Sequence, residues 1–142
     1  MEKRGVYVYG LIVFFCVINS ILFVSSCEDN QTILKLSHPT NAHLALWNTT
    51  DYEYEICFPN LFGYNYTGNN SHPKTCTSPV IWIEKDTNSH GATTSIDVFT
   101  IPICFGNLSC RSTTQSCLTN ERDVLHLDKS VNTHVSDKND PD

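Results

Sequence analysis

The chain has 142 residues, a formal net charge of −6 and seven cysteines. The acidic balance argues against nucleic acid as a partner, because phosphates require clustered Lys and Arg, and against an anionic membrane surface as the main partner. A chain of this length is enough for one domain with a small core.

A secretory signal is predicted over residues 1–26. Lys3 and Arg4 precede an apolar run from residue 6 to residue 24, and Val24 and Ser26 suit the positions before a cleavage site at Cys27. We therefore expect a secreted, extracellular product. Because the run is close to the length of a membrane span, the alternative is a protein anchored by this uncleaved segment, and a membrane is expected as a partner only in that case.

Short runs of β-type residues follow the signal in order. They lie at 33–36, 42–47, 52–58, 80–84 and 93–103. Residues 86–91 predict a hairpin connection between two of these runs. Pro102 indicates a strand end or an edge strand. We find no internal repeat and no segment with a helical period.

The C-terminal part is polar. Residues 124–127 predict one last strand or helical turn, and residues 130–142 read as disordered. The domain prediction is a signal over 1–26, a disulfide-linked glycosylated β domain over 27–120, and a polar, largely disordered tail over 121–142. The fold class is mainly β, a small disulfide-stapled sandwich or barrel with a disordered acidic C-terminal tail.

Six cysteines remain after the signal. An even number in a small secreted domain predicts three disulfides with 15 possible pairings, and the clustered spacing of the last three indicates that at least one reaches back to Cys57 or Cys76. The six are Cys27, Cys57, Cys76, Cys104, Cys110 and Cys117. Five Asn-x-Ser/Thr sequons predict glycosylation. They begin at Asn30, Asn48, Asn65, Asn69 and Asn107.

The sequence contains no motif for catalysis or for a cofactor. There is no Gly-x-Ser-x-Gly elbow, no His-Glu-x-x-His and no phosphate-binding loop. The histidines are scattered, and no CxxC-like spacing or nearby His pair suggests zinc. They are His38, His43, His72, His90, His126 and His134. We expect no catalytic, cofactor-binding or metal-binding residue and no enzymatic activity.

Aromatic residues gather around a predicted loop. Phe58, Phe62, Tyr64 and Tyr66 lie beside Pro59 and Gly63. Tyr and Phe on a rigid loop make good interface anchors, although packing of these rings under the loop is the alternative. They form the candidate interface for a protein partner, which we expect to be a cell-surface receptor or another extracellular protein.

The stretch from residue 95 to residue 110 resembles a segment of betaretrovirus-type envelope surface glycoproteins, where an alternating strand runs into Pro-(Ile/Met)-Cys-(Phe/Leu) and a second Cys follows. The matching positions here are Pro102, Ile103, Cys104, Phe105 and Cys110. The resemblance implies a truncated envelope surface fragment, secreted and unable to fuse membranes, that engages or blocks a cell-surface receptor.

The sequence therefore predicts a secreted, non-enzymatic glycoprotein module that acts through protein–protein contact. The envelope fragment is the first alternative. A small secreted hydrolase is the second, and the absence of a nucleophile motif counts against it.

Overall fold

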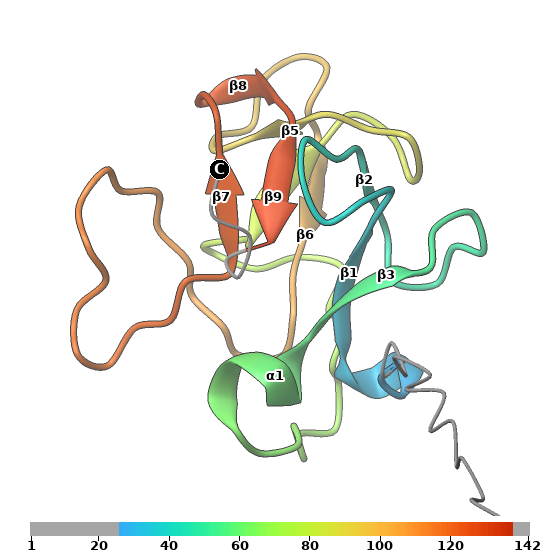
Figure 1. Ribbon diagram of the computed structural model, residues 1–142, viewed down its shortest axis with the longest axis vertical. Coiled ribbons are helices and arrows are strands. Elements are labelled where there is room, and N and C mark those ends of the chain that lie inside the picture. The colour runs from blue at the N-terminus through green and yellow to red at the C-terminus, as the bar shows by residue number, and fades with distance from the viewer. Residues whose placement is uncertain (1–25, 138–142) are drawn as a thin grey trace, which may run out of the picture.

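The computed structural model describes residues 26–137, which form a mainly β structure of short strands (Figure 1). The strands are β1 (Thr32–Leu36), β2 (Leu44–Ala45), β3 (Tyr54–Cys57), β4 (Ile81–Ile83), β5 (Gly91–Ala92), β6 (Ile101–Ile103), β7 (Leu125–Leu127), β8 (Val131–Thr133) and β9 (Val135–Asp137). A short 3₁₀ turn, η1 (Asp29–Gln31), and one short helix, α1 (Phe58–Phe62), accompany them. The predicted mainly β fold is confirmed. Within the described range no helix is long and apolar enough to cross a membrane.

The strands form three antiparallel sheets. Their orders are β2-β1-β3, β6-β4-β5-β8 and β7-β9. The predicted hairpin at residues 86–91 is confirmed as the connection between β4 and β5. Pro102 lies in β6, which is an edge strand of its sheet as predicted, because proline cannot donate a hydrogen bond to a second neighbour.

Three of the strand pairs are copies of one hairpin. In each copy, the residue seven positions before a histidine pairs with the residue directly after that histidine. These pairs are Leu36–Leu44 in β1–β2, Ile83–Gly91 in β4–β5 and Leu127–Val135 in β7–β9. The next rung matches as well, with pairs Lys35–Ala45, Trp82–Ala92 and His126–Ser136. The expectation of no internal repeat is wrong. The three hairpins repeat the same register of strand pairing, although few residues are identical between them.

The three hairpins close into a ring. Backbone bridges join each hairpin to another, and they connect Ala42 with Val135, Ser89 with Leu44, and Thr133 with Gly91. Each bridge uses the residue just before the histidine of one hairpin and the residue just after the histidine of another. All of the bridged residues are buried. The bridges therefore run around a pseudo-threefold axis, with the hydrophobic core on one side of the ring.

Two of the hairpins carry an outer strand. β3 pairs with β1, and β6 pairs with β4, both antiparallel. Each outer strand leads into Ile-Cys-Phe, at residues 56–58 and 103–105, with its cysteine 14 residues after the hairpin histidine. These cysteines form the disulfides Cys27–Cys57 and Cys76–Cys104. In the sheet pairing of residues 26–137, β7 has only β9 beside it.

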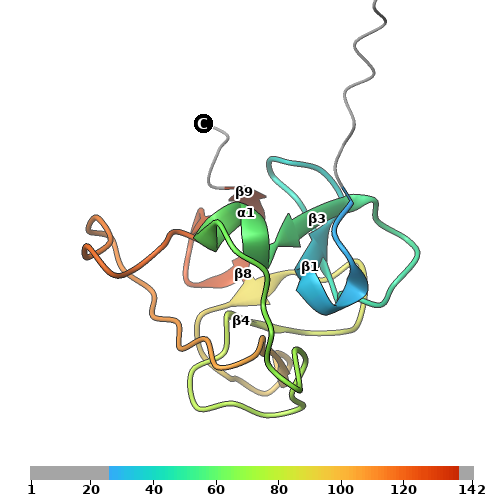
Figure 2. The same cartoon turned by 90° about the horizontal axis from the view of Figure 1, so that it is seen from below.

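The hydrophobic core gathers aliphatic and aromatic side chains from all three hairpins. Its buried members are Ile33, Leu34, Leu36, Ala42, Leu44, Ile56, Phe58, Leu61, Ile81, Ile83, Ile103, Phe105 and Val135. Figure 2 shows α1 beside β3 and β3 beside β1, while the loop between β6 and β7 projects away from the body.

The predicted strand or turn at 124–127 is confirmed as β7, whereas the predicted disorder is wrong for residues 131–137, which include β8 and β9. The segment has few apolar residues, but Val135 is only 1% exposed because the ring supplies its partners. The predicted strand at 93–103 is shorter than expected: β5 ends at Ala92 and β6 begins at Ile101. Residues 1–25 of the signal predicted over 1–26, and the last five residues of the chain, lie outside the described residues.

Candidate metal centre

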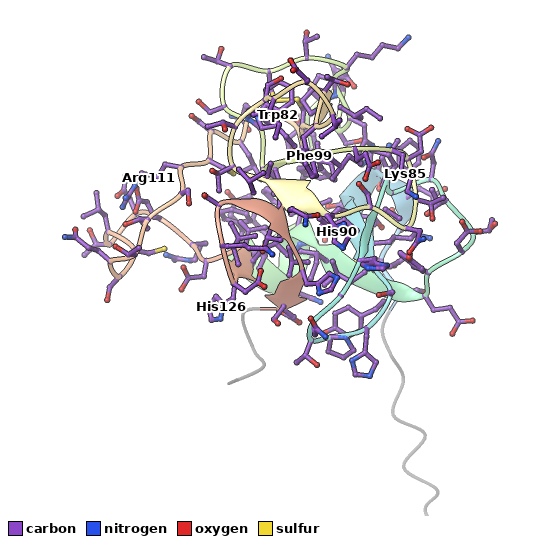
Figure 3. All side chains as sticks on the ribbon, turned by 90° about the horizontal axis from the view of Figure 1, so that it is seen from above. Trp82, Lys85, His90, Phe99, Arg111 and His126 are labelled. Carbon is purple, nitrogen blue, oxygen red and sulfur yellow. A yellow bond between two sulfur atoms is a disulfide. The ribbon has the colours of Figure 1, made fainter. Side chains whose placement is uncertain are left out.

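Three histidines, one from each hairpin, lie together. The ring centroids of His43, His90 and His134 are 4.8–4.9 Å apart. The Nε2 atom of His134 is 3.1 Å from Nε2 of His43 and 3.0 Å from Nε2 of His90. All three side chains are half-buried. Figure 3 labels His90 near the middle of the fold and His126, from β7, at its edge.

The ring explains why these side chains meet. Each histidine stands between two residues whose backbones bridge to other hairpins, and those two neighbours are buried. Successive side chains of an extended segment point to opposite faces, so the histidine points away from the core. Because the three positions are related by the pseudo-threefold axis, their rings converge on it.

An asparagine two residues before each histidine shapes the turn. Asn41, Asn88 and Asn132 have φ values of 46°, 49° and 52°. Asparagine adopts this left-handed conformation more readily than most residues. The turn leads the chain into the bridged segment and sets the direction of the imidazole that follows.

Two of these asparagines also hold a histidine of another hairpin. Nδ1 of His43 donates to Oδ1 of Asn88, and that oxygen also accepts the hydroxyl hydrogen of Tyr52 at 3.3 Å. Nδ1 of His134 donates to Oδ1 of Asn41 at 2.7 Å. An amide oxygen is only an acceptor, so both rings carry their hydrogen on Nδ1. When these rings are neutral, Nε2 is unprotonated and carries a free lone pair.

This arrangement suits a metal ion. Bare lone pairs 3.1 Å apart repel, and a shared cation removes the repulsion. Metal-bound histidines typically coordinate through one ring nitrogen and donate the other N–H to a fixed acceptor. In a tetrahedral zinc site with bonds of about 2.0–2.1 Å, ligand nitrogens lie about 3.3–3.4 Å apart. The three histidines offer ligand atoms that all lie within 4.8 Å of one another.

The surroundings favour the neutral, ligating form of one ring. Burial lowers the pKa of His90, and the neighbouring rings of His134 and His43 lower it further. Metal binding requires an unprotonated imidazole. Because the pKa of His90 is lowered, a metal ion competes less with protons for this ring near neutral pH.

Sequence reasoning missed these three ligands, and a signal for them was present. An Asn-x-His triplet occurs at 41–43, 88–90 and 132–134, each with aliphatic residues seven and nine positions before the histidine. The triplet at 70–72 has Asn65 and Gly63 at those positions instead. Its His72 stacks on Trp47 with centroids 4.1 Å apart, outside the cluster.

A second group of possible ligands does not offer a metal site. Cys27, Glu55 and Cys57 lie close together. The two cysteines are bonded to each other, so they have no thiolate to donate. The Glu55 carboxylate is also engaged, because its Oε1 atom lies 3.3 Å from Nζ of Lys35.

The six predicted disulfide cysteines divide into two groups. Cys76–Cys104 confirms that one of the last three cysteines reaches back to Cys57 or Cys76. The prediction of three disulfides is wrong in this structure, because Cys110 and Cys117 are free thiols. Cys117 donates to Asp123 at 2.8 Å. Counting an even number of cysteines assumes a partner inside the chain for each, and within residues 26–137 the third hairpin has no outer strand whose cysteine could bond to Cys117.

The predicted aromatic interface is mostly packed inside. Phe58 is 4% exposed and stacks on Phe62 and Phe105, with centroids 4.4 and 5.4 Å apart. Tyr66 contacts the rings of Phe58 and Phe105 edge-on. Only Tyr64 of the four is exposed, at 63%. The interface prediction is therefore wrong for Phe58, because the equivalent Ile-Cys-Phe segments stack their phenylalanines in the core.

The asparagines of the predicted glycosylation sequons are all exposed. They are Asn30, Asn48, Asn65, Asn69 and Asn107.

Comparisons with protein-family models, with curated proteins and with solved structures find no match to this chain. The metal centre therefore rests on the geometry of the three hairpins.

Proposed function

We propose that this protein is an extracellular glycoprotein module that binds a divalent first-row transition-metal ion, Zn²⁺ foremost, through Nε2 of His43, His90 and His134. One observation carries the proposal. Nε2 of His43 and Nε2 of His134 face each other at 3.1 Å while asparagine oxygens hold the hydrogens of both rings on Nδ1. Imidazole nitrogen is a preferred ligand of zinc, copper and nickel.

Three protein ligands leave one position of a tetrahedral ion open. In zinc sites of this kind, the open position holds water or an exchangeable ligand. The three rings are half-buried, so this position faces solvent and is available to a side chain of a binding partner. The proposal is metal binding without an enzymatic reaction, and the expected lack of catalysis stays a prediction.

The extracellular assignment is part of the proposal. Two disulfides are typical of an oxidising compartment, and the exposed sequon asparagines support glycosylation. Because zinc and disulfides use separate residues here, oxidation of the cysteines does not compete with the histidine site.

The receptor and envelope hypotheses stay predictions. The Pro-Ile-Cys-Phe motif that carries the envelope resemblance begins in β6 and ends just after it, and its Ile-Cys-Phe recurs at residues 56–58, where β3 meets α1. The repeat of the fold supplies an internal reason for that motif, whichever hypothesis holds.

The proposal is tested by titrating the purified full chain with ZnCl₂ in a calorimeter. We expect one ion per chain. His134→Ala removes the central ligand and should weaken binding by at least about 100-fold, more than the usual cost of losing an outer-sphere partner. His126→Ala, an exposed histidine on β7, is the matched control and should bind like the parent. Equal binding by the two variants, or no binding by the parent, overturns the proposal.

A further inference from the structure

The third hairpin has an open edge. β1 lies between β2 and β3, and β4 lies between β5 and β6, whereas β7 pairs only with β9 among the described strands. An unpaired edge presents backbone N–H and C=O groups that another strand can pair with. The repeat therefore marks this edge as the position of an outer strand.

A groove runs beside this edge. Its volume is about 1100 Å³, and it is lined by residues of β7, of the loop between β6 and β7, and of the segment around β4. Leu108, Val124, Leu125 and Leu127 are partly buried apolar members of its lining. Figures 1 and 2 show the loop standing away from the body, and Figure 3 labels Arg111 on it. The groove gives a strand both an apolar floor and access from solvent.

The groove also contains a free thiol at the repeat position. Cys27 and Cys76 lie 16 and 14 residues before their hairpin histidines, and Cys117 lies 17 residues before His134. The first two bond to the cysteine of an outer strand. Cys117 is unbonded and lines the groove. Among residues 26–137, no strand pairs with the other edge of β7.

We infer that the free edge of β7 is the docking site for an extended strand of a partner polypeptide that carries an aliphatic-Cys-Phe sequence and becomes disulfide-bonded to Cys117. The strand adds to the sheet edge by main-chain pairing, with side-chain pockets giving selectivity. The inference does not depend on metal binding, because it uses neither the three histidines nor their asparagines.

The register of the docked strand follows from the other two hairpins. Ile56 pairs with Leu34, and Ile103 pairs with Ile81, each one residue before its cysteine. The equivalent of Leu34 and Ile81 in the third hairpin is Leu125. The partner's aliphatic residue therefore lies opposite Leu125 in an antiparallel pair. Its cysteine then lies at the N-terminal end of β7, which is the end nearer in sequence to Cys117.

The covalent step is a thiol–disulfide exchange. The partner cysteine arrives as a mixed disulfide with a small thiol. The Cys117 thiolate attacks the partner's sulfur, the new Sγ–Sγ bond forms, and the old S–S bond breaks with release of the small thiolate. The proton of Cys117 goes to solvent, and no net oxidation occurs.

The test uses the full chain with Cys110→Ser, which removes the second free thiol. The probe is the peptide Tyr-Glu-Tyr-Glu-Ile-Cys-Phe, the sequence of residues 52–58, as its mixed disulfide with glutathione. The matched control is a peptide of the same composition with Cys kept in place and the other residues scrambled. Intact mass follows adduct formation, and Cys117→Ser gives the background.

We expect the matched peptide to modify Cys117 at least about ten-fold faster than the scrambled one, because docking raises the local concentration of its disulfide. Hydrogen exchange should also slow at Leu125 and Leu127 when a Cys→Ser form of the peptide binds the Cys117→Ser protein. Equal rates for both peptides overturn the inference. So does a Cys110–Cys117 bond in the oxidised parent, or a homodimer linked through Cys117.

Discussion

Gly91 allows one methyl group to test the packing of the threefold ring. It occupies the position held by Leu44 and Val135 in the other hairpins, and all three are buried. A Cβ at residue 91 would lie 2.4 Å from Cδ1 of Ile81 and 2.9 Å from Cδ1 of Leu44. Carbon atoms at van der Waals contact are about 3.5–4.0 Å apart, so Gly91→Ala must displace both side chains.

The expected cost follows from those distances. Ile81 and Leu44 are 2% and 0% exposed, so neither has free space into which it can move. Adding a methyl group to a packed core costs about 1–3 kcal/mol. We expect a lower midpoint of urea unfolding with an unchanged slope, and a melting temperature lower by about 4 °C for each kcal/mol.

A double-mutant cycle separates this clash from other effects. Ile81→Val removes Cδ1, the atom nearest to the new Cβ, so Gly91→Ala should cost less in that background. Gly63→Ala is the control, because Gly63 has φ 79° and nothing within 4 Å of a built Cβ. Its cost arises from the backbone conformation, about 1–2 kcal/mol, and should not change with Ile81→Val. An equal cost of Gly91→Ala in both backgrounds would refute the packing described for the ring.

Three other predictions concern the metal site and the projecting loop. Asn88→Gly keeps the positive φ but removes the acceptor of His43 Nδ1–H, so calorimetry should show Zn²⁺ affinity lower by about 10–100-fold. Asp123 accepts the Cys117 S–H and raises the pKa of that thiol; Asp123→Asn should lower this pKa and speed alkylation by iodoacetamide at neutral pH, with an unchanged rate contradicting the contact. The Arg111 guanidinium holds the pKa of Glu121 at about 2, so Arg111→Gln should move the carboxylate titration seen by NMR to higher pH, and an unmoved titration would show that the pair does not persist in solution.

The local features of the fold could be predicted from the sequence. Short runs of β-type or apolar residues located β1, β3, β4 and β7 to within a few residues, and the polar segment at 86–91 indicated a hairpin. These signals work because alternation and turn chemistry depend on neighbours along the chain. The clustered spacing of the last three cysteines also predicted that at least one of them reaches back to Cys57 or Cys76, and Cys104 does so.

The tail and the metal site could not be predicted in this way. Residues 130–137 have only two aliphatic side chains, Val131 and Val135, and these are too few to suggest order, yet they suffice when two other hairpins already supply the core. The histidines are 47 and 44 residues apart, and no spacing rule for metal ligands covers such separations. Their convergence follows from the closure of the ring, which depends on register across all three hairpins.

The pseudo-threefold axis imposes opposite demands on its two sides. On the core side, the residues after the histidines are Leu44, Gly91 and Val135, so one side chain is absent where three would collide. On the other side the chain carries an imidazole at every position, although two pairs of Nε2 atoms are 3.0 and 3.1 Å apart. On the core side, Gly91 relieves the equivalent crowding because it has no side chain. A smaller residue in place of one histidine would relieve the crowding of the imidazoles in the same way. Three imidazoles whose Nε2 atoms converge, two of them with the hydrogen held on Nδ1, are instead the arrangement that a shared cation stabilises. This is why the axis is the place where we expect metal to bind.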